Sequence, residues 1–120
     1  MSRIETFENS HPDRDYLISI SNPEYTSKCP RTGLPDCGTI TIRYIPDRLC
    51  LELKSLKLYF LEYRDRGIFY EEAINRILDD LVASCQPRWM ELTGKFNVRG
   101  GMSSRIRVAY GERSDTIETI

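Results

Sequence analysis

The sequence lacks several features by which common classes of protein are recognised. It has a single histidine, and its four cysteines form no Cys-x-x-Cys pair, so a zinc site is poorly supported. No apolar run approaches the ~20 residues of a membrane-spanning helix, and residues 1–17 hold no stretch as long as a secretory signal needs. The net charge of −1 argues against a nucleic-acid binder that works through excess positive charge. We expect a cytosolic chain with free thiols and no direct nucleic-acid binding.

What the sequence does contain is ordinary for a globular protein. It has 120 residues, of which 40% are hydrophobic and 29% are charged, which predicts one domain spanning residues 1–120. Residues 1–14 and 111–120 are polar and lack periodicity. We therefore expect these two segments to be flexible tails.

The hydrophobic pattern predicts an α+β fold with the element order ββααββ. Alternating residues predict strands, and a spacing of three or four predicts helices. The predicted segments are a hairpin at 38–53 with its turn at 46–47, helices at 54–66 and 69–85, strands at 89–98 and 105–110, and a candidate short strand at 16–20. The two helices would cover one face of an antiparallel sheet. Its unpaired edges lead us to expect a ring or barrel of subunits.

The loop SKCPRTGLPD, residues 27–36, carries the first candidate site. Cys29 precedes a proline in a stiff loop, and Lys28 and Arg31 flank it, so their charges would lower its pKa and favour a nucleophilic thiolate. Asp36 closes the same loop and would donate a proton if burial raised its pKa. The alternatives are an incidental loop thiol and a turn-forming aspartate.

Three further segments carry charges in unusual places. Lys54 and Lys57 share the first turn of a predicted helix, where cations are disfavoured unless an anion binds there through the free backbone N–H groups. Glu71 lies at the margin of an apolar stripe, which predicts partial burial. Arg99 precedes Gly100 and Gly101, and an arginine fork suits phosphate. The alternatives are a solvated basic face, a helix-dipole contact and ordinary hairpin glycines.

The motifs CPRTGLPD, ELKSLKLY, GIFYEE and RGG, in this order, resemble the NADPH-dependent 7-cyano-7-deazaguanine reductases, the nitrile reductases of queuosine biosynthesis, a tRNA modification. The resemblance runs from about residue 22 to residue 101. It implies the tunnelling fold, in which subunits assemble into barrels with active sites between them, and it implies a decamer. It also implies reduction of the substrate's nitrile to an aminomethyl group by two NADPH.

The resemblance assigns roles to the candidate residues. It implies that Cys29 attacks the nitrile carbon to form a covalent thioimide and that Asp36 is the proton donor. The substrate-binding positions it implies are Leu51, Glu52, Leu53, Tyr70 and Glu71. The cofactor-contacting positions it implies are Lys54, Lys57, Arg99 and Gly100.

One position departs from the family pattern, because many relatives carry histidine where this chain has Tyr70. A phenol does not titrate near neutral pH, so we expect Tyr70 to bind substrate rather than to act as an acid or base. Two other functions stay open from the sequence. One is an amidine-forming transferase acting on tRNA, against which the intact ELKSLKLY motif argues. The other is a purine-binding or assembly module without catalysis, which leaves Cys29 without a role.

Overall fold

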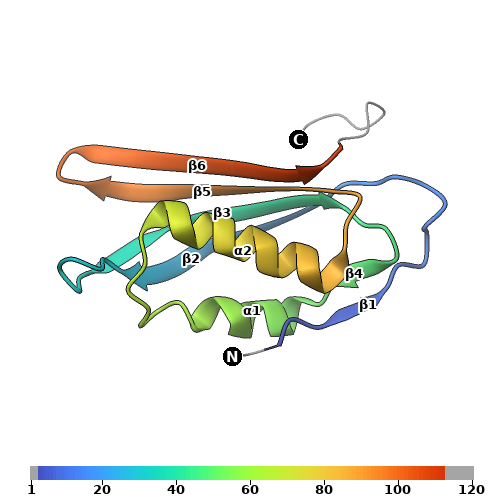
Figure 1. The fold of residues 1–120 in the computed structure, drawn as a ribbon, viewed down its shortest axis with the longest axis horizontal. Coiled ribbons are helices and arrows are strands. Elements are labelled where there is room, and N and C mark those ends of the chain that lie inside the picture. The colour runs from blue at the N-terminus through green and yellow to red at the C-terminus, as the bar shows by residue number, and fades with distance from the viewer. Residues whose placement is uncertain (1–2, 113–120) are drawn as a thin grey trace.

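A computed structural model describes residues 3–112, and it confirms the α+β fold class (Figure 1). Two helices lie on one face of a four-stranded antiparallel sheet, and a second sheet of two short strands lies beside them. The elements are β1 (Thr6–Glu8), β2 (Ile18–Lys28), β3 (Pro35–Ile45), β4 (Leu49–Leu51), α1 (Leu53–Leu61), α2 (Tyr70–Cys85), β5 (Trp89–Arg99) and β6 (Met102–Gly111).

The large sheet has the strand order β2-β3-β5-β6. Burial alternates along β3, where Ile40, Ile42 and Tyr44 are buried and face the helices. This is the period-two pattern of a half-buried strand, as the sequence predicts. β2 and β6 are the edges of the sheet in the described part of the chain, and each pairs with one neighbour.

The predicted hairpin at residues 38–53 is wrong. β4 does not pair with β3 but with β1, in a register that places Cys50 opposite Phe7. The Leu51 N–H donates to the hydroxyl of the buried Tyr44 at 2.9 Å, so a core side chain takes a donor that a hairpin ladder would use. β3 instead pairs with β2 on one side and β5 on the other. β2 has 11 residues, whereas the sequence predicts only a short strand at 16–20.

The predicted flexible tail at residues 1–14 is also only partly correct. Thr6–Glu8 form β1, and Asn9 is buried, with its side-chain amide donating to the Asp47 carbonyl at 2.8 Å. This bond ties the beginning of the chain to the turn before β4. At the other end β6 continues to Gly111, and residues 113–120 of the predicted second tail lie outside the described residues.

The apolar stripe predicted for residues 69–85 is the buried face of α2, which packs over β5 and β6. Gly94 permits the close approach, because a Cβ there would lie 2.5 Å from Cδ1 of Ile74. α1 ends at Leu61, earlier than the predicted Arg66, and the fully buried Tyr63 follows in a turn. No helix within residues 3–112 is both long enough and apolar enough to cross a membrane.

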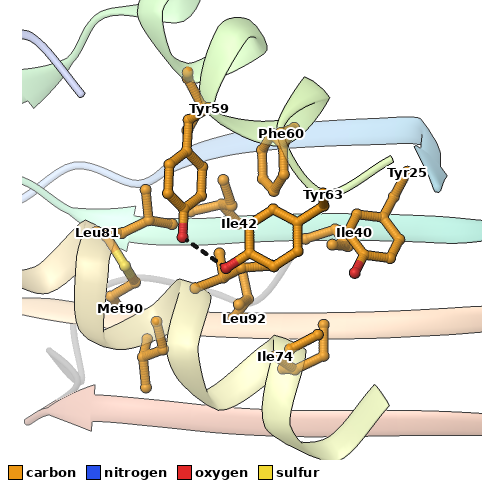
Figure 2. Close-up of a cluster of buried hydrophobic side chains, with 14 of the residues drawn as sticks. Tyr25, Ile40, Ile42, Tyr59, Phe60, Tyr63, Ile74, Leu81, Met90 and Leu92 are labelled. Atoms are coloured by element: carbon orange, nitrogen blue, oxygen red, sulfur yellow. Dashed lines mark hydrogen bonds between the residues drawn. The ribbon is translucent and has the colours of Figure 1, made fainter. Parts of the chain in front are cut away.

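Hydroxyl groups inside the core join the two helices. The Tyr59 hydroxyl donates to an Asp80 carboxylate oxygen at 2.6 Å and lies 3.0 Å from the Tyr63 hydroxyl, as the dashed line in Figure 2 shows. Burial, then the bonds to Asp80 and Tyr63, raise the pKa of Tyr59 far above its usual value. Since α1 and α2 are braced here, the segment between them is held in a fixed place.

Candidate active site

The loop between β2 and β3 holds Cys29 at the end of a paired hairpin. The Cys29 N–H donates to the Leu34 carbonyl at 2.9 Å, and the Gly33 N–H donates to the Cys29 carbonyl at 2.8 Å. Gly33 has a φ of 73°, a conformation that favours glycine. Lys28 and Pro35 pair directly below this turn. The loop is therefore rigid, and it leaves the Cys29 side chain partly exposed.

The pKa of Cys29 is lowered from its usual value, as the sequence predicts, but for a different reason. The hydroxyl of Thr32 and the backbone N–H groups of Arg31 and Thr32 hydrogen-bond the sulfur. The predicted cause was the charge of Lys28 and Arg31, but the Lys28 ammonium pairs with Asp65 at 3.4 Å. Hydrogen bonds to the thiolate, rather than neighbouring cations, favour its ionised form.

Asp36 lies near this thiol on β3, where its carboxylate is held by groups from two other elements. Its side chain is 10% exposed, and Nη1 of Arg99 lies 3.0 Å from its Oδ1. The same Nη1 donates to the Pro35 carbonyl. The Tyr70 hydroxyl, at the start of α2, also donates to the Asp36 carboxylate. The predicted catalytic pair is thus brought together, and Arg99 belongs to the same cluster.

Tyr70 is fixed by its ring as well as by its hydroxyl. The ring stacks on Phe96 of β5, with centroids 3.8 Å apart and planes 9° from parallel. Burial, then the hydrogen bond to Asp36, raises its pKa to about 12. Tyr70 is therefore neutral over the physiological range, which agrees with a binding or orienting role rather than acid-base work.

The beginning of α2 reaches Cys29 because the segment before it is bonded to β2. The Lys28 N–H donates to the Arg66 carbonyl at 2.9 Å, and the Ile68 N–H donates to the Lys28 carbonyl at 3.1 Å. Tyr70 and Cys29 lie near enough to interact electrostatically. Glu71 follows Tyr70 but is exposed in the single chain, so the predicted partial burial is wrong for an isolated subunit.

The other predicted site residues form a second group, at β4 and the beginning of α1. They are Leu51, Glu52, Leu53, Lys54 and Lys57. α1 ends near the segment that contacts β2, so its first turn points away from Cys29, toward the opposite end of the molecule (Figure 1). The structure does not bring this group to the Cys29 end of the same chain.

Glu52 has a local role that the sequence analysis did not predict. It lies after β4 rather than on a strand face, and its carboxylate accepts hydrogen bonds from the N–H groups of Lys54 at 2.7 Å and Ser55 at 2.8 Å. These bonds cap α1 and lower the pKa of Glu52. The expectation that an anion binds these free N–H groups is therefore wrong, because the carboxylate occupies them.

The lysine side chains of the second group still fit an anionic ligand. Lys54 and Lys57 are both exposed, and the first turn of α1 contains no acidic residue. The expectation that both lysines share this turn is wrong for Lys57, because α1 begins at Leu53 and Lys57 is its fifth residue. At the other end of the molecule, Gly100 and Gly101 have φ values of 59° and 80°, and an added Cβ on either would meet nothing within 4 Å. Glycine is therefore favoured at both positions by the positive φ angle, and not by a lack of space for a side chain.

Two contributors to the site were missed from the sequence. Thr32 hydrogen-bonds the Cys29 sulfur, and Phe96 supports the ring of Tyr70. Thr32 lies three residues after the cysteine, a spacing that is a weak signal for a hydroxyl-to-thiolate bond. Phe96 gave no signal, because its contact with Tyr70 depends on how α2 crosses β5.

Fold and site together define an α+β protein with an activated cysteine in a hairpin loop beside a clamped carboxylate. The family model described as QueF-like protein matches residues 35–115. A NADPH-dependent 7-cyano-7-deazaguanine reductase of Chlorobaculum tepidum is 59% identical over 112 residues, covering 93% of this chain and 96% of the relative. A reductase of the same name from Chlorobium phaeovibrioides is 59% identical over 107 residues, covering 89% and 92%.

The chain belongs to the QueF-like protein family, so the resemblance given by its motifs is confirmed. A solved structure, the archaeosine synthase QueF-Like in the apo form, matches with a TM-score of 0.75 and 23% identity. The match covers 82% of this chain and 96% of that one. At this identity the likeness supports the fold, which is the fold of a QueF-like protein.

Proposed function

We propose that the protein is a NADPH-dependent reductase that converts the nitrile of 7-cyano-7-deazaguanine to an aminomethyl group, in the cytoplasmic biosynthesis of queuosine. Its relatives at 53–59% identity carry the name of this reductase. The observation that carries the proposal is the Cys29 sulfur, which is partly exposed, hydrogen-bonded by Thr32 and near the carboxylate of Asp36. A thiolate and an acid placed together are the groups that addition to a nitrile needs.

In the first step Cys29 adds to the nitrile. The thiolate forms a carbon–sulfur bond, one carbon–nitrogen π bond breaks, and Asp36 gives its proton to the nitrogen. The product is a neutral thioimide attached to Cys29. The rigid loop holds the sulfur in one direction, so that the substrate needs only to bind in line with it.

Reduction then releases the cysteine. NADPH, when bound, supplies one hydride to the thioimide carbon and a second NADPH supplies one to the imine that follows. After the first hydride transfer the carbon–sulfur bond breaks and Cys29 leaves as thiolate. Asp36, protonated again from solvent, gives the second proton to nitrogen. One nitrile, two hydrides and two protons yield one primary amine.

The remaining predicted residues hold the substrate and the cofactor. Glu71, exposed beside Tyr70, would accept hydrogen bonds from the guanine-like edge of the substrate. The ammonium groups of Lys54 and Lys57 would attract the cofactor's phosphates, and Leu51, Glu52 and Leu53 would border the substrate pocket, as the resemblance implies. Because this second group points away from Cys29, we propose that neighbouring chains supply the two halves of each site.

Such a site requires an oligomer, which we propose is a barrel closed by its edge strands and, by family resemblance, a decamer. β2 and β6 are the edges available for pairing within residues 3–112. Sedimentation velocity tests this directly. A closed ring is expected to sediment as one large species at micromolar concentration, and a monomer at the same concentration would contradict the shared site.

The activity is tested by supplying 7-cyano-7-deazaguanine and NADPH. We expect two NADPH oxidised per nitrile consumed, and the aminomethyl product by mass spectrometry. A covalent adduct on Cys29 without NADPH oxidation would contradict the reductase and favour the amidine-forming transferase. Neither an adduct nor NADPH oxidation would favour a module that binds purines without catalysis.

A further inference from the structure

The side chain of Tyr70 bridges two strands of the large sheet. Its hydroxyl donates to the carboxylate of Asp36 on β3, and its ring stacks on Phe96 of β5. Tyr70 is the first residue of α2, and the N-cap residue before it is Phe69, whose side chain has no hydrogen-bonding atom. Because a helix end without a side-chain cap is held weakly by the helix itself, these two contacts are what fix Tyr70.

Phe96 is in turn held by the core around it. It is 2% exposed, and the ring of Tyr25 meets it edge-on, with centroids 6.0 Å apart and planes 76° apart. Gly38 lies directly opposite Phe96 in the β3–β5 pair, and a Cβ there would come within 2.9 Å of Cδ1 of the Phe96 ring. A Cβ on Gly94 would come within 2.9 Å of Cε2, on the opposite edge of the same ring. The two glycines thus leave the room that the ring occupies, which fixes its plane.

The contacts lead from this core ring to the reacting groups. Phe96 sets the plane of the Tyr70 ring, and the hydroxyl at the far end of that ring holds the carboxyl group of Asp36. Asp36 lies near enough to the Cys29 sulfur to interact electrostatically. A proton donor works only when its acidic group points at the atom that receives the proton. A tilt of the Tyr70 ring would therefore misdirect the carboxyl group without removing a reacting group.

We propose that Phe96 is a positioning residue for the addition of Cys29 to the nitrile. The stack keeps the phenol ring of Tyr70 in one plane, and the phenol hydroxyl keeps the Asp36 carboxyl group in the direction in which it delivers its proton. The resemblance assigns no role to Phe96. This inference rests on the proposed reductase function.

The test measures how fast 7-cyano-7-deazaguanine adds to Cys29, followed by intact-protein mass spectrometry in the absence of any hydride donor. Phe96→Leu keeps the position apolar but removes the flat ring. Because an aromatic pair biases an equilibrium by about two- to tenfold, and because Arg99 still holds Asp36, this variant should form the adduct about fivefold more slowly. The slowing should appear in the maximum rate at saturating nitrile, since the direction of proton delivery matters after the substrate has bound.

A double-mutant cycle shows whether Phe96 acts through the hydroxyl of Tyr70. Tyr70→Phe keeps a ring on Phe96 but removes the hydroxyl, and it should also slow adduct formation about fivefold. Adding Phe96→Leu to this variant should slow it by no more than about twofold further, because the group that the stack positions is already gone. Two residues that act independently would instead multiply their losses to about 25-fold.

Leu92→Val is the matched control for general damage to the core. Leu92 is buried on the same face of β5 but lies outside the stack of Phe96 with Tyr70. Leu92→Val should lower the melting temperature, as Phe96→Leu does, while its adduct forms at the rate of the unaltered protein. Circular dichroism of each variant checks that the fold is intact.

An unchanged maximum rate in Phe96→Leu would overturn the proposal. So would a double variant about fivefold or more slower than Tyr70→Phe, or a loss of rate in Leu92→Val equal to that in Phe96→Leu. In each of these cases an adduct on the unaltered protein leaves the reductase proposal standing. If the unaltered protein forms no adduct, the proposed function itself fails, and the inference fails with it.

Discussion

The charged residues at the two ends of the molecule are arranged in opposite ways. At the Cys29 end, Tyr70 and Arg99 each bond to Asp36 from a different element, near a thiol that stays partly exposed. At the beginning of α1, Lys54 and Lys57 project from a helix end that already has its cap. The first arrangement is organised within one chain, whereas the second presents charge outward.

The contrast separates the charged groups that one chain brings together by itself from those that project outward. Cations near the N-terminus of a helix are disfavoured by the helix dipole, by about 0.3–1 kcal/mol each. In this structure the Glu52 carboxylate already lies at that helix end, where it accepts from the N–H groups of Lys54 and Ser55 and attracts the Lys54 ammonium, which offsets part of this cost. One chain by itself places Asp36 and Arg99 beside Cys29. That the beginning of α1 serves a site completed by a neighbouring chain is our proposal.

The largest expected effect is at the Cys29 end. Replacing Cys29 with alanine should reduce NADPH oxidation in the presence of the nitrile by at least about 10³-fold, because the covalent step has no other nucleophile. The fold should be unaffected, since the side chain is partly exposed. Cys37→Ala is the matched control, because it removes an exposed thiol from the neighbouring strand β3. Turnover by Cys29→Ala within tenfold of normal would contradict the assignment.

A smaller effect is expected at the beginning of α1. The double change Lys54→Ala with Lys57→Ala should raise the KM for NADPH about tenfold and change kcat less than about twofold, because two phosphate-attracting charges are lost. Lys95→Ala, on β5, is the control. An unchanged KM would contradict a role for these two lysines in binding NADPH.

The smallest effect concerns how the thiolate is stabilised. Thr32→Val removes the hydroxyl that hydrogen-bonds the Cys29 sulfur, so the pKa of Cys29 should rise toward its usual value. The midpoint of its alkylation by iodoacetamide should move upward by about half a pH unit. Thr26→Val, beside Cys37 at 3.8 Å, should leave this midpoint unchanged. An unchanged midpoint in Thr32→Val would contradict this role of the hydroxyl and would show that other groups stabilise the thiolate.

The sequence predicts the periodic elements well and their partners poorly. The apolar stripe of α2 and the alternating apolar residues of β3 are strong sequence signals, because each of these elements buries one face. Alternation does not say which strand lies beside which. The sequence therefore predicts that residues 49–51 pair with β3, whereas the structure pairs them with β1. β2 was underestimated because its register shifts between Asn22 and Tyr25, which breaks the alternation.

The site shows the same limit. Cys29 and Asp36 could be identified from one short loop, but the contact between Asp36 and Arg99 joins residues 63 positions apart. It exists because β3 pairs with β5, which no local pattern reveals. The cap by Glu52 was also missed, because glutamate is not among the residues preferred at the N-cap position.

Whether two chains share each site can be determined by mixing two defective proteins. Cys29→Ala chains retain the lysines of α1, and Lys54→Ala/Lys57→Ala chains retain the thiol. The two are dissociated, mixed and reassembled, and NADPH oxidation is measured at low NADPH concentration. We predict that the mixture exceeds the summed activity of the two variants reassembled separately. Activity no greater than that sum would contradict the claim, because it would mean that each chain needs its own thiol and its own lysines.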